Sequence, residues 1–141
     1  MIVGIGIDTE SVARVARLLQ DHAEKIDRIF TSRERAACEN AGTSISHRMR
    51  QYAAAFAAKE AVMKALATGW KSGIEWADIE TPVSPSTRAR LRGEIACIAV
   101  RKNVAQIIVS TAITRESVLA TAVAESAADT ALGCASARKD F

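Results

Sequence analysis

Two segments of this sequence hold the residues whose types and spacing could do chemistry. Residues 4–10 (GIGIDTE) end an apolar run with two carboxylates, and residues 56–66 (FAAKEAVMKAL) contain two lysines and one carboxylate. The five ionisable residues are Asp8, Glu10, Lys59, Glu60 and Lys64. Carboxylate oxygens bind hard divalent cations, and amines offset the charge of phosphate groups. Together these groups could hold a divalent cation against a polyphosphate during phosphoryl transfer.

An apolar strand and an amphipathic helix are expected to position the first two acids. Residues 2–7 predict a buried strand, and Asp8 falls at its end. Over residues 11–20 the apolar side chains recur at helical spacing, which leaves Arg14 and Arg17 on another face. Asp8 is therefore either a site residue or the cap of this helix. A cap role does not account for Glu10.

A long helix is expected to carry the second set. The T-x-x-E pattern at Thr31 and Glu34 is typical of a capping box and predicts a short helix that ends near residues 40–42. Thr43 or Ser44 can cap the long helix that follows, which runs to about residue 68, where Gly69 can close it.

A lysine lies at the centre of the apolar stripe of this long helix. At helical spacing the stripe consists of Tyr52, Phe56, Lys59, Met63 and Leu66. Lys59 either extends its alkyl chain along these neighbours toward water or has a function there. Glu60 and Lys64 lie one turn apart in the favourable order for an ion pair, so they are either a surface pair or site residues.

The rest of the chain completes a predicted α+β domain. After a loop through Pro82 and Pro85 and a short apolar segment at Leu91, residues 94–102 favour a helix. Residues 105–110 and 118–124 favour strands. We expect one domain over residues 1–125 and a flexible tail over residues 126–141, which are rich in Ala, Ser and Asp without an apolar stripe.

Composition narrows the classes of function. The chain has 19 Lys and Arg against 16 Asp and Glu, and the resulting net charge of +3 is too mild by itself to indicate nucleic-acid binding. Its three cysteines are widely spaced and form no CxxC pair, so a reducing cytoplasm is expected, with neither disulfides nor a zinc site. No segment approaches the roughly 18 apolar residues of a membrane span, and nothing indicates export or anchoring.

Three motifs in order make this sequence resemble the short 4′-phosphopantetheinyl transferases of the holo-acyl-carrier-protein-synthase type. They are GIGID at residues 4–8, RIFTSRE at residues 28–34 and FAAKEAVMK at residues 56–64. The last motif is highly specific, and the resemblance covers roughly residues 2–125. Residues 58–62 also resemble the transferase domain of fungal-type fatty acid synthases. The resemblance implies the transferase fold, in which a long central helix packs on a small, mainly antiparallel sheet.

The resemblance implies an enzyme that transfers 4′-phosphopantetheine from coenzyme A to a serine of an acyl carrier protein and releases adenosine 3′,5′-bisphosphate. Asp8, Glu60 and Lys64 are the implied catalytic residues, and Asp8 and Glu60 would bind Mg²⁺. Glu10 is assigned as a third metal ligand, direct or through water, because D-x-E is the pattern of the surfactin-synthetase and fatty-acid-synthase types. The implied contacts to coenzyme A come from Lys59, Lys64, Arg48, Arg50 and Gly69.

The partners follow from the same resemblance. Carrier proteins are acidic around their serine, so Arg14 and Arg17, close in sequence to the proposed metal ligands, are expected to dock the carrier protein. The short class also implies a homotrimer with sites at subunit interfaces, in the cytoplasm, with no nucleic acid or membrane as partner.

Some positions depart from the family pattern. Ala55 stands where many relatives have Arg, Ile113 stands where a late-strand His often falls, and residues 84–90 replace a G-K-P turn. These departures leave open a catalytically impaired relative that binds coenzyme A or carrier protein without turnover. A more distant alternative is a small basic nucleic-acid-binding module, although interleaved aromatic residues and a known recognition motif are missing.

Overall fold

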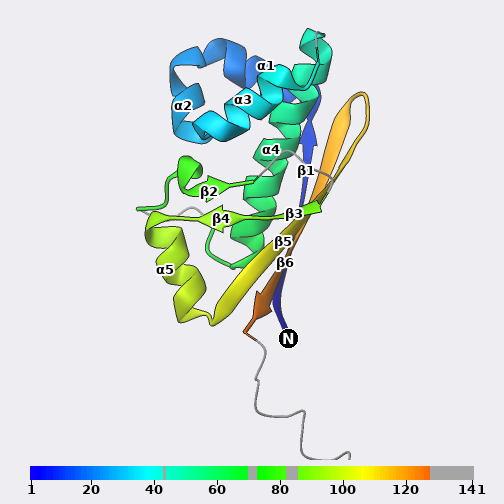
Figure 1. Cartoon of the computed structure of the whole chain (residues 1–141). Helices are drawn as coiled ribbons and strands as arrows, with labels where there is room; N and C mark the ends of the chain where they lie inside the picture. The colour runs from blue at the N-terminus through cyan, green and yellow to red at the C-terminus, as the bar shows by residue number, and fades with distance from the viewer. Residues whose placement is uncertain (43, 70–72, 82–85, 128–141) are drawn as a thin grey trace, which may run out of the picture.

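A helix of 21 residues, α4 (Ile45–Ala65), forms the centre of the computed structural model, which describes residues 1–42, 44–69, 73–81 and 86–127. It packs on one face of a four-stranded antiparallel sheet with the order β1-β6-β5-β3 (Figure 1). The strands are β1 (Ile2–Ser11), β3 (Ser86–Arg88), β5 (Val104–Ile113) and β6 (Ser117–Ser126). The predicted α+β class and the helix-on-sheet arrangement are confirmed.

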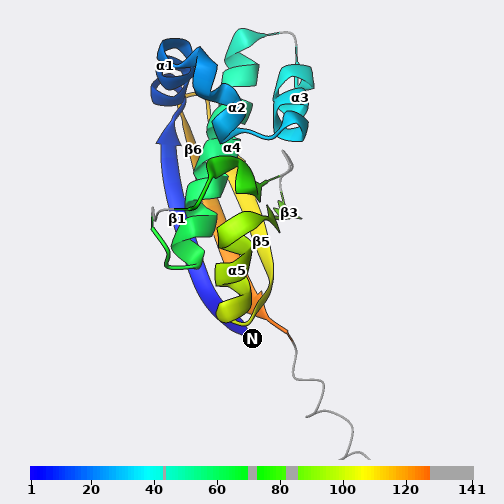
Figure 2. The ribbon, with the colours of Figure 1, turned by 90° about the vertical axis from the view of Figure 1, so that its left-hand side faces the viewer.

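Smaller elements cover the remaining sides of α4 (Figure 2). Near its N-terminal half lie α1 (Val12–Asp21), η1 (Ala23–Lys25), α2 (Ile26–Ile29) and α3 (Ser32–Asn40). Nearer its C-terminal half lie η2 (Trp76–Asp78), α5 (Gly93–Arg101) and a two-stranded sheet of β2 (Ile79–Glu80) and β4 (Arg90–Leu91). Because α4 is enclosed in this way, its residues from Tyr52 to Ala65 are buried, with the exception of Glu60 and Lys64.

Glycines bring β1 directly against the backbone of α4. A Cβ added at Gly6 would lie 1.9 Å from the Ala61 carbonyl oxygen, and Gly4 approaches the helix equally closely. Side chains alternate between the two faces of a strand, so Asp8 and Glu10 point to the same side as the two glycines. The spacing of the glycines and the acids along β1 therefore places both carboxylates on the face that α4 covers.

The opposite face of β1 is apolar and open. Ile5 is 60% exposed and Ile7 is 55% exposed. The prediction of a buried strand is therefore wrong for the single chain. The physical reason is that α4 covers only one face of the sheet, and β1 turns its glycines, not its isoleucines, toward that helix.

The helix boundaries agree with the sequence patterns except at two caps. Ser11, not Asp8, caps α1, because the Ser11 hydroxyl accepts a hydrogen bond from the Arg14 backbone N–H at 3.3 Å. The capping box of α3 is confirmed. The prediction that Gly69 closes α4 is wrong, because Ala67, with φ of +48°, adopts the left-handed conformation that ends the helix.

The other sequence predictions concern the second half of the chain. The predicted helix at residues 94–102 corresponds to α5, and the two predicted strands correspond to β5 and β6, each of which is longer than expected. Thr43, Pro82, Pro85 and most of the predicted tail lie outside the described residues. In the part of the chain that the structure describes, no helix has the length and apolar character needed to span a bilayer.

Candidate active site

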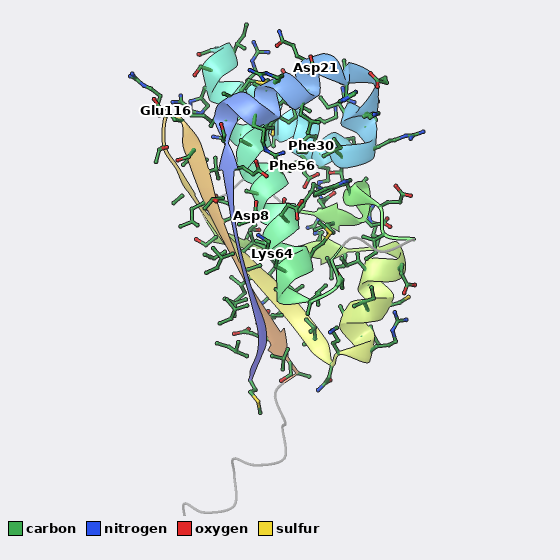
Figure 3. All side chains as sticks on the ribbon, turned by 180° about the vertical axis from the view of Figure 1, so that it is seen from behind. Asp8, Asp21, Phe30, Phe56, Lys64 and Glu116 are labelled. Atoms are coloured by element: carbon green, nitrogen blue, oxygen red, sulfur yellow. The ribbon has the colours of Figure 1, made fainter. Side chains whose placement is uncertain are left out.

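Asp8 and Lys64 meet where the end of α4 crosses β1. The Lys64 amine donates to Asp8 Oδ1 at 2.7 Å and to the Ile7 carbonyl oxygen at 3.0 Å. Figure 3 shows the two labelled side chains next to each other, one from the strand and one from the helix. The hydrogen bond to Asp8 raises the pKa of Lys64. The structure thus pairs Lys64 with the strand carboxylate, and not with Glu60 in a surface pair along the helix.

Glu60 is the second carboxylate of this group. It is partly buried on α4, one turn before Lys64. Burial raises the pKa of Glu60, and the negative charge of Asp8 raises it further, while the positive charge of Lys64 opposes the shift. The Asp8 carboxylate, which comes from another element, therefore lies close enough to disfavour the charge of Glu60, with one ammonium beside the two acids.

The donor set fits a divalent cation. Asp8 Oδ2 is buried and has no hydrogen-bond partner among the described residues, which leaves one carboxylate oxygen available inside the site. Within the same described ranges, no group of three or more His, Cys, Asp or Glu side chains is arranged to hold a metal ion. Asp8 and Glu60 alone suit Mg²⁺, which commonly takes one or two carboxylates and completes its shell with water and substrate phosphate.

Glu10 lies beside this group, but its carboxylate is engaged elsewhere. The Arg14 guanidinium donates to both oxygens of Glu10, with Arg14 Nε at 2.9 Å from Oε2. The Glu10 side chain is only 7% exposed, and the Arg14 guanidinium lies 5.9 Å from the centre of the Phe56 ring. The Glu10 hydrogen bond is the main cause that raises the pKa of Arg14. In this structure the Glu10 oxygens are occupied by an arginine, so Glu10 is not placed as a free third metal ligand.

Lys59 points to the other side of α4. Its amine donates to Glu34 Oε2 at 2.8 Å, to the Trp76 carbonyl oxygen at 3.1 Å and to the Ile79 carbonyl oxygen. Its side chain is fully buried, and burial lowers its pKa while the Glu34 carboxylate opposes that shift. Since an ammonium has three donors and all three are used, the expected contact of Lys59 with phosphate is not available in this structure.

Of the three other predicted contacts to coenzyme A, two lie away from Glu60 along α4. Arg48 pairs with Glu39 at 2.8 Å, and Arg50 lies 3.5 Å from the His47 ring, both near the start of α4. They precede Glu60 by about 15 Å or more of helix. Gly69 follows the other end of α4.

Sequence reasoning missed the partners of Lys59. Glu34 was predicted only as a helix cap, and Trp76 and Ile79 contribute main-chain oxygens, which leave no mark in a sequence. The available signal was the burial of Lys59 in an apolar stripe, because a fully buried amine requires an acid and further acceptors nearby.

Fold and site define a class of protein, and comparison with known proteins assigns the family. The family model described as the 4′-phosphopantetheinyl transferase superfamily matches residues 4–122. The chain belongs to this superfamily. Asp8, Lys59, Glu60 and Lys64 all lie within the matched region.

Named relatives and solved structures agree with this assignment. A holo-[acyl-carrier-protein] synthase of Methylobacterium radiotolerans is 44% identical over 93 residues, which span 65% of this chain and 65% of that protein. The crystal structure of a Plasmodium yoelii holo-ACP-synthase superposes with a TM-score of 0.72 at 23% identity, covering 90% of this chain and 97% of the other. A Bacillus anthracis holo-(acyl-carrier-protein) synthase in complex with coenzyme A (3′,5′-ADP) gives a TM-score of 0.62 at 28% identity, covering 90% and 99%.

Proposed function

We propose that this protein transfers 4′-phosphopantetheine from coenzyme A to a serine of an acyl carrier protein and releases adenosine 3′,5′-bisphosphate. The observation that carries the proposal is the meeting of Asp8, Glu60 and Lys64 at the contact between β1 and α4. Membership of the superfamily and the names of its relatives support the same reaction. The coenzyme A complex of the Bacillus anthracis relative supports the donor substrate.

The chemistry is a displacement at phosphorus. The serine oxygen forms a bond to the phosphorus that carries pantetheine, and the bond from that phosphorus to the bisphosphate oxygen breaks. Mg²⁺ held by Asp8 and Glu60 would supply positive charge that offsets the negative charge of the pyrophosphate. Lys64 places its ammonium group beside the same carboxylates. Glu60, which is held beside Asp8 at this contact, would accept the serine proton.

The arginines of α1 suit an acidic carrier protein. Arg17 is exposed, and Arg14 is held next to Asp8 and Glu60 by its bonds to Glu10. A positive helix beside the carboxylate group would steer an acidic partner so that its serine meets the pyrophosphate. We place this activity in fatty acid biosynthesis in the cytoplasm. The likeness of residues 58–62 to the transferase domain of fungal-type fatty acid synthases remains a prediction.

The open face of the sheet suits contact with further copies of the chain. It exposes large apolar side chains from two strands: Ile5 and Ile7 of β1 and Leu119 of β6. An apolar surface of this kind is usually covered by a partner. It supports the proposed homotrimer with sites at subunit interfaces, because β1, the strand that carries Asp8, is at the edge of the sheet. In such an assembly, Arg48 and Arg50 of one subunit would contact the phosphates of a coenzyme A bound at a neighbouring subunit.

Intact mass spectrometry tests the proposal. Apo carrier proteins from fatty acid, polyketide and peptide synthesis are incubated with the protein, coenzyme A and Mg²⁺. The mass of each carrier protein is then measured. We expect one carrier protein to gain the mass of a phosphopantetheine group, with Asp8→Asn as the inactive control. Binding of coenzyme A without any mass gain would instead identify an impaired relative, in keeping with the departures at Ala55 and Ile113.

A further inference from the structure

A buried ion pair lies on the side of α4 that faces away from Asp8. Lys59 and Glu34 both have side chains with no exposed surface, and their charged atoms lie 2.8 Å apart. Glu34 also accepts hydrogen bonds from the Thr31 N–H at 2.8 Å and from the Thr81 N–H at 2.7 Å. The pair therefore joins α4 to the start of α3 and to the residue that follows β2.

Every donor and acceptor of this pair is satisfied within the chain. The two remaining donors of Lys59 go to the carbonyl oxygens of Trp76 and Ile79, and the Thr81 hydroxyl also donates to Glu34 at 3.1 Å. A buried charge pair is tolerated when additional hydrogen bonds complete it, and removing one partner leaves an uncompensated charge. Lys59 therefore has no N–H donor left with which to bind a ligand.

The pair holds α4 opposite its contact with β1. On the β1 side the helix backbone is fixed by the close approach at Gly6, and on the far side it is fixed by Lys59. Glu60 is the next residue, and Lys64 follows one turn later. A rotation of α4 about its axis would break one of the two fixed sides, so the direction in which Glu60 and Lys64 point depends on both.

We propose that Lys59 and Glu34 are positioning residues that fix the rotation of α4 and so aim Glu60 and Lys64 at Asp8. This role rests on the proposed transferase function, and it replaces a phosphate contact for Lys59. Lys59 acts through its neighbour in sequence. It touches neither coenzyme A nor the reacting phosphate.

Three variants separate positioning from phosphate binding. Lys59→Met keeps the length of the side chain and removes the charge. Glu34→Gln removes the opposite charge and keeps an acceptor for the Thr31 N–H, while its amide NH2 replaces the oxygen that accepts from Thr81. The third combines both changes. Ile95→Ala, in the core of α5, is the matched destabilising control, because Ile95 is fully buried but belongs to another element.

The expected result has a stability part and a kinetic part. Lys59→Met lowers Tm by roughly 10 °C, because it leaves the Glu34 charge unpaired. At a temperature where all variants are folded, it lowers kcat about tenfold and leaves the KM for coenzyme A within about twofold. Adding Glu34→Gln restores more than half of both losses, whereas Ile95→Ala lowers Tm with little change in kcat.

Calorimetric titration with coenzyme A and Mg²⁺ completes the test. If Lys59→Met weakens coenzyme A binding tenfold or more and Glu34→Gln does not restore it, Lys59 contacts the nucleotide and the inference is wrong. An unchanged kcat in Lys59→Met also overturns it. If the wild-type protein neither binds coenzyme A nor transfers, the proposed function fails, and the recovery of Tm in the double variant still decides whether the pair fixes α4.

Discussion

The two oxygens of the Asp8 carboxylate have different environments, and Lys64 creates the difference. Lys64 Nζ lies 2.7 Å from Oδ1, whereas Oδ2 is buried and has no hydrogen-bond partner in the described part of the chain. One oxygen thus ties α4 to β1, and the other remains available to a cation. A buried carboxylate oxygen without a partner costs stability, so the site is arranged for a ligand at the expense of the free protein.

Removing either carboxylate should abolish most activity without loss of the fold. We expect Asp8→Ala and Glu60→Ala each to lower transfer by at least about 10²-fold, because the charge that stabilises the pyrophosphate is lost. Thermal stability should stay level or rise for Glu60→Ala, since the two acids repel each other, whereas Asp8→Ala also loses its bond to Lys64. Rates from intact mass spectrometry, with Glu94→Ala on α5 as a control carboxylate, check this. Near-normal transfer by Glu60→Ala would contradict the site.

The stability of the metal-free protein should depend on the charge of Glu60. Its pKa is raised from 4.5 in the folded state, so the folded protein holds this proton more tightly than the unfolded chain. The free energy of unfolding therefore falls as pH rises from the ordinary pKa through the raised one. We expect Glu60→Gln to be more stable than the wild type at pH 7 and equally stable at pH 3.5.

Urea unfolding in EDTA at the two pH values measures this difference. Mg²⁺ in excess should then stabilise the wild type and not the variant, because a ligand that binds only the folded state shifts unfolding by mass action. A variant that is less stable than the wild type at pH 7 would show that ionised Glu60 is favourably paired.

Arg17 offers the cleaner test of carrier docking, because Arg14 is tied to Glu10. We expect Arg17→Glu to raise the KM for the carrier protein about tenfold and to leave the KM for coenzyme A unchanged. The defect should shrink at high salt, because screening removes from the wild type the attraction that the variant lacks. Arg101→Glu on α5 is the control. An equal effect on both substrates would assign Arg17 to the nucleotide site.

Gly6→Ala should disrupt the contact between β1 and α4. The added Cβ would lie 1.9 Å from a backbone oxygen that cannot move alone, so we expect a loss of about 3 kcal/mol or more. Gly69→Ala is the matched control. Its φ of +55° is unfavourable, but nothing lies within 4 Å of the added Cβ, and the expected loss is about 1 kcal/mol. Denaturant unfolding compares the two, and equal losses would exclude the steric cause.

The apolar open face of the sheet makes a prediction about assembly. We expect Ile7→Asp to convert a trimer into monomers, because an unpaired carboxylate would be buried in the interface. Val100→Asp, at a position on α5 that is 76% exposed, should leave the assembly unchanged. Sedimentation velocity distinguishes the species. A wild-type monomer would exclude the proposed assembly.

Local patterns predicted most of the elements and the main pair of acids. The helical stripe around Phe56, the capping box at Thr31 and the position of Asp8 after an apolar run all depend on neighbours within a few residues. Such patterns are visible in a sequence because they repeat at fixed spacing. The side of α4 to which Lys59 points also followed from its place in the stripe.

Contacts between distant segments were not predictable in the same way. The Lys59 amine meets main-chain oxygens 17 and 20 residues away, and the position of these oxygens depends on the complete fold. The engagement of Glu10 by Arg14 depends on how β1 leads into α1, which the two side chains alone do not reveal. The exposure of Ile5 and Ile7 was missed because an apolar run does not show which face is covered.

The alternation of β1 makes the spacing between its glycines and its acids a fixed quantity. Deleting Ile7, the one residue between Gly6 and Asp8, would turn the carboxylate to the open side of the sheet and bring Thr9 toward the amine of Lys64. Deleting a residue before Gly4 would change the pairing of the first residues with the end of β6 and would leave the alternation from Gly4 to Glu10 intact. We therefore expect a deletion or insertion before Gly4 to be tolerated better than one between Gly4 and Glu10, where it would reverse the faces of the acids.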